Sequence, residues 1–159
     1  MTDARFEDGA DRPLRLMAVE PSDLEVISTL TQDAVFPVTE MSWRPAERRF
    51  ALLVNRFRWE DADFARSRAR DFERVQSVLE VGDVKAIRSQ GVDRSDKDVI
   101  LSLLAMGWDD GEDGTGTLTL TLAGDGAIAL DAECVNVRLT DVTRPYIAPS
   151  RKAPKHDQD

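Results

Sequence analysis

The side chains best suited to chemistry in this 159-residue chain lie in its arginine-rich middle. Two arginines alternate with aromatic residues along one predicted strand, and a third lies on a later strand. Guanidinium groups bind carboxylates and phosphates through paired hydrogen bonds, and aromatic rings beside them add stacking surface. The candidate contact set for a protein, an acidic peptide or a small anionic ligand is therefore Arg56, Arg58, Trp59 and Arg88.

The same segment also fits a plain solvated surface. Acidic residues interleave with the arginines between positions 60 and 73, as is typical of a salt-bridged, exposed face. Residues 44–94 are net positive, whereas residues 109–141 hold Arg138 as their single cation. These opposite charges also suit self-association. The overall net charge of −9 makes nucleic acid an improbable partner.

A pair of carboxylates, Asp131 and Glu133, is the alternative site. The two residues are separated by one position on a predicted strand, and alternate strand residues share a face. Neighbouring carboxylates can divide acid and base roles between them. Threonines on the facing strand indicate a solvated sheet face instead, so an enzyme built on this pair is the second hypothesis.

The other reactive side chains assemble no catalytic set. His156, the only histidine, lies three residues from the C-terminus, where nothing would hold it within reach of a proton. Cys134, the only cysteine, falls on the apolar face of its predicted strand, so we expect a buried core residue. The acidic run at 109–114 lacks the spacing of a calcium loop, and the glycines form no phosphate-binding loop. We predict no catalytic residue, no metal and no cofactor.

The hydrophobic periodicity predicts one helix and about seven strands. The helix spans Pro21–Ala34, with Ser22 and Glu25 at capping-box spacing. Residues 14–19 form a further short strand, and residues 135–142 either continue the last strand past a bend or form another. The main strands are 38–43, 50–59, 75–81, 84–89, 99–108, 117–122 and 128–134. Segments 50–54 and 99–108 are apolar on both faces, so we expect them to be covered on both sides.

Two hairpins have a register that the sequence specifies. A Gly82-Asp83 turn predicts that 75–81 pairs with 84–89. A three-residue loop over 124–126 predicts that the leucines of 117–122 share a face with Ile128 and Leu130, because only an odd loop keeps both apolar sets on one side. Runs of hairpins without intervening helices favour an α+β fold. We predict a mostly antiparallel, strongly curved sheet or partly closed barrel, PH-like in form, with the N-terminal helix packed on it.

The composition is that of a globular domain, with 42% apolar and 32% charged residues. We predict a disordered leader over residues 1–12, a single domain over 13–143 and a disordered tail over 144–159. No apolar stretch is long enough to span a bilayer, and the N-terminus has no apolar segment like that of a secretory signal. The expected location is the cytoplasm, without membrane contact.

The order of several segments resembles the uncharacterised bacterial family known as domain of unknown function 2948. The resemblance covers most of the chain, and the family implies no catalytic residue, cofactor or partner. It is carried by the runs LTQDAVFPVTEMSW at 30–43, RFALLVNRFRWED at 49–61, ERVQSVLEVGDVKAIRSQGVD at 73–93, GDGAIALDAECVNVRLTDV at 124–142 and RPYIAPSRKAPKH at 144–156.

Three functional hypotheses follow from the sequence. The first is a non-enzymatic cytoplasmic module that binds or assembles through the arginine and aromatic middle of the chain. The second is a small enzyme that uses carboxylates and arginines without His or Cys. The third is a structural homo-oligomer held by the charge asymmetry between the basic middle and the acidic last third.

Overall fold

The computed structural model describes residues 13–61 and 73–146. Within them the fold is α+β, as predicted, but it has ten strands rather than about seven. The α-helix is α2 (Pro21–Leu30). The strands are β1 (Arg15–Ala18), β2 (Ala34–Pro37), β3 (Met41–Arg44), β4 (Arg49–Phe57), β5 (Arg74–Val81), β6 (Val84–Gln90), β7 (Ile100–Asp110), β8 (Gly116–Leu122), β9 (Gly126–Ala132) and β10 (Val137–Asp141). Three short 3₁₀ helices complete the described part: η1 (Val38–Glu40), η2 (Pro45–Glu47) and η3 (Trp59–Asp61).

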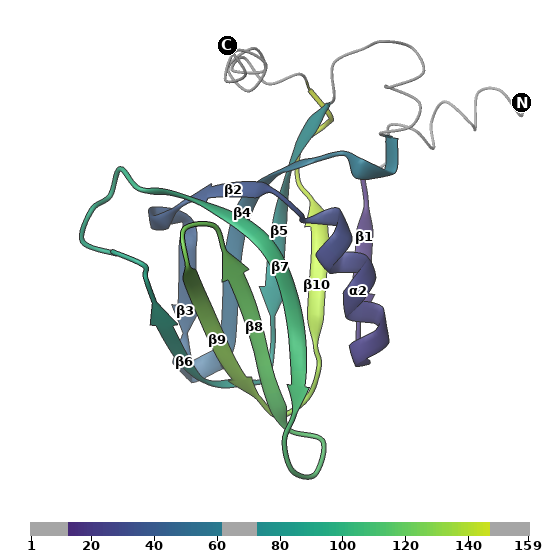
Figure 1. Cartoon of the computed structure of the whole chain (residues 1–159). Coiled ribbons are helices and arrows are strands. Elements are labelled where there is room, and N and C mark those ends of the chain that lie inside the picture. Colours follow the sequence, from purple (N-terminus) through teal and green to yellow (C-terminus); the bar gives the residue numbers. More distant parts are fainter. Residues whose placement is uncertain (1–12, 62–72, 147–159) are drawn as a thin grey trace, which may run out of the picture.

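All ten strands belong to one sheet that curves but does not close. The strand order is β1-β10-β5-β4-β2-β7-β8-β9-β6, and β3 pairs with β4 outside this path. Neighbouring strands of the described part all pair antiparallel. Figure 1 shows β7, β8 and β9 in front of β4 and β5, so that the sheet folds over itself. The helix α2 lies at one side, against β1 and β7, and β3 and β6 lie at the other.

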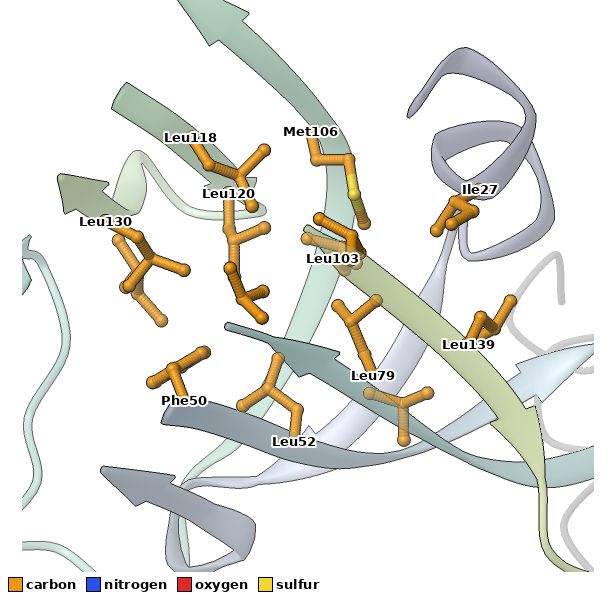
Figure 2. Packing of buried hydrophobic residues seen from close by; sticks show 14 of the residues in the cluster. Ile27, Phe50, Leu52, Leu79, Leu103, Met106, Leu118, Leu120, Leu130 and Leu139 are labelled. Carbon is orange, nitrogen blue, oxygen red and sulfur yellow. The ribbon is translucent and has the colours of Figure 1, made fainter. Parts of the chain in front are cut away.

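The core fills the space between the two halves of the curved sheet. Leu52 and Leu79 come from one half and face Leu103 and Leu120 of the other (Figure 2). The helix adds Ile27 where the two halves diverge. Burying such a side chain contributes about 1.5–3 kcal/mol, so the apolar faces that the alternation of the strands creates stabilise the fold.

The helix begins where the sequence predicts and ends earlier. Pro21 occupies its first turn, but the residue before the helix is Glu20, and no side chain caps its amino end, so the predicted Ser22 cap is absent. The helix stops at Leu30 because the chain turns through Asp33, whose φ is 65°, into β2. The predicted helical Ala34 is therefore the first residue of a strand.

The predicted strand over residues 38–43 is wrong in its boundaries. The chain forms β2 before it, then the 3₁₀ turn η1, then β3. β2 pairs with β7 and, through Val35, with Asn55 of β4, whereas β3 pairs with the first half of β4. Two short strands thus occupy one edge of β4, which accounts for part of the extra strand count.

The β8–β9 hairpin keeps the predicted faces but not the predicted loop. Leu118 pairs with Leu130 and Leu120 with Ile128 on the buried face. The three-residue loop is 123–125, one position earlier than predicted, with Gly124 and Asp125 at positive φ. Gly126 is instead the first paired residue of β9. The register moves by two residues, which preserves the face of every side chain.

The predicted pairing of β5 with β6 is wrong. β5 lies between β4 and β10, and β6 pairs with β9. The turn carries the chain from one half of the sheet to the other: the Gly82 N–H donates to the Asn136 carbonyl at 2.9 Å, and the Val84 N–H to the Arg48 carbonyl at 2.9 Å. A Cβ at Gly82 would lie 2.6 Å from Asn136 Nδ2, so a larger residue would displace this amide, which donates to Asp83 Oδ2 at 3.0 Å.

The prediction that the 99–108 strand is covered on both faces is also wrong for β7. A register shift between Leu103 and Ala105 places Leu103 in the core, fully buried, and leaves Leu104 41% exposed. Such a bulge lets two residues oppose one on the partner strand. In β4, likewise, Ala51 and Leu53 of the outer face are only half-buried.

The described residues bear on the predicted tail only at its start. Tyr146 forms a bridge with Arg74, with N–H to carbonyl distances of 2.6 and 2.8 Å. The leader over residues 1–12 and the tail from 147 onward lie outside the described residues, so their disorder stays a prediction.

Candidate functional site

Arg56, the first predicted contact residue, is buried in an ionic cluster. The inward face of β4 continues from Phe50, Leu52 and Val54 to Arg56, whose side chain is fully buried. Its Nη2 lies 3.0 Å from both Glu60 Oε2 and Asp141 Oδ1, and its Nε donates to Ser77 Oγ at 3.0 Å. Burial opposes the charged form of Arg56, but its bonds to the two carboxylates raise the pKa of the guanidinium above its ordinary value. Arg56 is therefore bound within the interior of the fold and is not exposed to solvent.

Arg58 and Trp59 also bond to other parts of the fold. The Arg58 side chain is 9% exposed, and its Nη1 lies 2.7 Å from Glu73 Oε1. The Trp59 indole N–H donates to the Gln32 carbonyl at 2.9 Å, and its ring lies 5.2 Å from that of Phe57. Arg88 is on β6 at the far end of the sheet order. The structure thus does not bring the four candidate contact residues onto one surface.

The pKa of Glu60 determines how the stability contributed by this cluster depends on pH. Burial alone would raise the pKa of Glu60, but hydrogen bonds and charge from Arg56 hold it below the ordinary value of 4.5. A lowered folded-state pKa stabilises the fold at pH above 4.5, and that stabilisation is lost as the pH falls through the folded value. We expect the difference in unfolding free energy between wild type and Glu60→Gln to be constant above pH 6 and to shrink below 4.5.

Urea titrations at a series of pH values measure that difference. Glu47→Gln is the control, because Glu47 forms an exposed ion pair with Arg44, and the two side chains are 51% and 66% exposed. A Glu60→Gln variant whose stability tracks wild type at every pH would contradict the role assigned to this carboxylate.

The carboxylates of the alternative site are each engaged by a different arginine. Asp131 accepts from Arg88 Nη2 at 2.6 Å and from Thr117 Oγ1 at 2.9 Å. Glu133, just beyond β9, lies 2.6 Å from Arg48 Nη1. Hydrogen bonds from Arg88 lower the pKa of Asp131, whereas a general acid at neutral pH needs a raised one. The arrangement therefore favours ion pairing over acid–base chemistry.

Cys134 is exposed, so the prediction of a core cysteine is wrong. β9 ends at Ala132, the chain bends, and Val135 is buried in its place. The thiol lies 3.4 Å from Asp83 Oδ2. Partial burial and then the nearby Asp83 carboxylate raise the thiol pKa, which lowers the fraction of reactive thiolate.

An apolar cavity opens between β3 and β6. This β3–β6 groove has a volume of about 170 Å³. Phe50 and Ile128, 3% and 2% exposed, are the most deeply buried of its lining residues. The rest of its lining comes from β3, from β6 and from the 91–99 loop: Met41, Trp43, Ile87, Ser89, Val92 and Arg94. The period-two alternation explains the lining, because Met41 and Trp43 face inward while Ser42 and Arg44 face outward.

The groove lies at the side of the curved sheet that the α-helix α2 leaves uncovered (Figure 1). On the opposite side α2 packs against β1 and β7 and buries Leu24 and Ile27. Near the start of β6 the two halves of the sheet are tied together by the Val84–Arg48 backbone bond. At the other end the 91–99 loop crosses over, and the Val38 N–H donates to the Val99 carbonyl at 3.0 Å.

Arg94 supplies the charge at the groove. Within residues 13–61 and 73–146 it takes part in no ion pair. The acids beside it bind their own loop: Asp93 accepts from the Ser95 N–H and Asp96 from the Asp98 N–H, each at 3.0 Å. An apolar cavity beside a guanidinium that forms no ion pair with the described residues suits a ligand that carries one apolar group and one anionic group.

Two other hollows are less suited to a ligand. One, of about 90 Å³, is polar, and its Arg49 is already 3.4 Å from Glu80. The other, of about 390 Å³, is an open depression on the outer faces of β1 and β10 beside Met17, which is 54% exposed. In the described part of the chain, no group of three or more His, Cys, Asp or Glu residues is placed to hold a metal ion.

Sequence reasoning missed the groove entirely. Its residues come from segments that look unrelated in the chain, and Arg94 lies in a polar loop with mixed charge. The alternation of Met41 and Trp43 was a usable signal. The closeness of β3 to β6 could not be predicted from the sequence, because no local pattern encodes which strand edges stay unpaired.

These features define an α+β module built on one open antiparallel sheet, with an apolar groove between two strand edges. The chain belongs to the family described as "Protein of unknown function (DUF2948)", which matches residues 14–156. Comparisons with curated proteins and with solved structures returned no match. The PH-like form therefore stays a prediction. None of the helices among the described residues has the length and apolar character needed to cross a membrane.

Proposed function

We propose that this chain is a non-enzymatic cytoplasmic binding module whose ligand site is the β3–β6 groove. The observation that carries the proposal is a solvent-accessible apolar cavity at the side of the sheet that α2 leaves uncovered, with Arg94 beside it. Exposed apolar concavities on a folded domain are typical of binding sites. The ligand class predicted from the sequence, a protein, a peptide or a small anion, is retained, but the contact moves from Arg56 and Arg58 to this groove.

The two alternatives draw less support from the same contacts. The carboxylates Asp131 and Glu133 are neutralised by separate arginines, which leaves the enzyme hypothesis without an acid–base pair. Self-association through charge asymmetry rests on the charge pattern of the sequence alone. The groove, by contrast, combines concavity, apolar lining and one available cation.

Filling the groove should abolish binding of an anionic apolar probe. The dye 8-anilinonaphthalene-1-sulfonate combines aromatic rings with a sulfonate, so we expect wild type to bind it with enhanced fluorescence. Ser89 is exposed at the groove wall, and Ser89→Phe places a ring in a cavity of about 170 Å³. A cavity of about 150 Å³ accepts one benzene, so the added ring occupies the site. We expect affinity for the dye to fall at least tenfold.

The control is the neighbouring position on the same strand. Gln90→Phe adds the same ring one residue later, on the opposite face of β6, and should leave dye binding unchanged. Both variants must unfold cooperatively in urea, because loosened proteins also bind this dye. Equal dye binding by wild type and Ser89→Phe would place the binding site elsewhere.

A further inference from the structure

We propose that the groove binds a short extended peptide of about five residues as an added strand on β6. The peptide pairs with the Ile87–Gln90 half of β6, inserts one bulky apolar side chain into the cavity and places a carboxylate against Arg94. This inference rests on the proposed function and names the ligand of the same site.

The free edge of β6 supplies the backbone partners. β6 ends the sheet order, so no strand among the described residues pairs with its outer edge. Unpaired edges present N–H and C=O groups to an incoming strand. The first half of β6 is blocked, because the Val84 N–H already donates to the Arg48 carbonyl and the register shifts between Val84 and Ala86. The half from Ile87 to Gln90 pairs regularly with β9 and contains no proline.

The size of the cavity favours a peptide over a whole small molecule. Sites for cofactors and drug-sized ligands usually measure about 300–1,000 Å³. A volume of about 170 Å³ holds one aromatic or branched aliphatic group. A peptide meets this limit, because one side chain enters the cavity while its backbone gains hydrogen bonds along the edge of β6.

The charge of Arg94 specifies the second contact. Strand side chains alternate, so residues two positions apart in the bound peptide face the same side. An apolar anchor in the cavity therefore puts a carboxylate two residues away on the side of Arg94. That carboxylate can be an Asp or Glu side chain or the C-terminal group of the peptide, and both present the same anion to the guanidinium.

The test uses the full chain, the same dye as reporter and a positional-scanning library of acetylated pentapeptides. We expect pools with Phe, Leu or Ile two residues before an acidic group to displace the dye. Free and amidated C-termini, with and without Asp or Glu, identify which carboxylate is used. Arg94→Gln should weaken the selected peptides about tenfold, whereas removal of their carboxylate should cost nothing further in that variant.

Strand addition has its own readouts. N-methylation of alternate peptide amides should reduce binding at least tenfold, and hydrogen exchange at Ile87–Gln90 should slow in the complex. N-methylated pools that bind as well as the parent, or library pools that never displace the dye, would overturn the inference. Displacement by sodium phenylacetate as strong as that by any peptide would overturn it too, in favour of a small anion.

The outcomes separate this inference from the proposed function. If Ser89→Phe loses dye binding but no peptide pool displaces the dye from wild type, the groove is a binding site and the peptide proposal is wrong. Absence of both dye and peptide binding removes both proposals. A dimer mass by light scattering that reverts to monomer in Ser89→Phe would assign the β6 edge to a second copy of the chain, which also contradicts the peptide.

Discussion

Replacing Arg56 with methionine is expected to lower the free energy of unfolding by about 3–5 kcal/mol. The substitution keeps an unbranched apolar side chain on the inward face of β4. Among the described residues, it removes the one cation that pairs with Asp141, whose side chain is 5% exposed. A buried carboxylate without its partner costs more than the pair contributes, because neither water nor protein compensates its charge. Asp141 also accepts the Leu14 N–H at 2.9 Å, so β1 should loosen together with the cluster.

Two comparisons isolate the buried charge as the cause. Arg88→Met removes an arginine from a shorter ion pair, 2.6 Å to Asp131 against 3.0 Å between Arg56 and Asp141, but its two side chains are 62% and 32% exposed. Exposed pairs contribute at most about 1 kcal/mol, so this control should scarcely change stability. Adding Asp141→Asn and Glu60→Gln to Arg56→Met should restore much of the loss, since no uncompensated charge then remains.

Urea unfolding followed by tryptophan fluorescence measures all of these variants. Arg56→Lys covers the case in which Arg56→Met does not fold, because lysine keeps the charge but cannot reach both carboxylates with a planar fork. It should fall between wild type and Arg56→Met. A loss in Arg56→Met no greater than that in Arg88→Met would contradict the structural role of the cluster.

The second large expected effect is a difference in stability between alanine variants of the neighbouring residues Leu103 and Leu104. Leu103→Ala should cost about 2–5 kcal/mol, because Leu103 is fully buried between the halves of the sheet. Leu104→Ala removes the same atoms from the next residue and should cost less than about 1 kcal/mol, because Leu104 is 41% exposed. The register shift in β7 is the physical cause of this difference between neighbours.

The same urea titrations compare the two variants directly. If the apolar run 99–108 were covered on both faces, as its composition predicts, both substitutions would be severely destabilising. Equal losses would show that a further segment covers Leu104. Equal m-values in the two variants would confirm that the difference lies in the native state and not in the extent of unfolding.

The parts of the fold that the sequence predicted are those that depend on neighbouring residues. Pro21 marks the helix start, and the parity of Leu118, Leu120 and Ile128 places them on one buried face. Both follow from backbone geometry over a few residues. The helix end at Leu30 was not predicted, because Ala34 fits the apolar stripe of a helix. Ala34 belongs to the sheet only because β2 pairs with β7.

Pairing between distant strands lay outside the reach of local patterns. The Gly82-Asp83 turn fits a tight hairpin, yet the chain crosses between the two halves of the sheet there: β5 pairs with β4 and β10, and β6 pairs with β9. The prediction that Cys134 is buried was wrong for a related reason. The alternation of faces holds only within a strand, and β9 ends at Ala132.

The sequence by itself determined the fold class, the family and the face of most strand residues. Only the tertiary structure decided that Arg56 is interior and that an uncovered groove forms between β3 and β6. Alternation states which side chains share a face. It does not state whether that face ends in solvent, in a carboxylate cluster or at an open edge, because those outcomes depend on which distant segments the curvature of the sheet brings together.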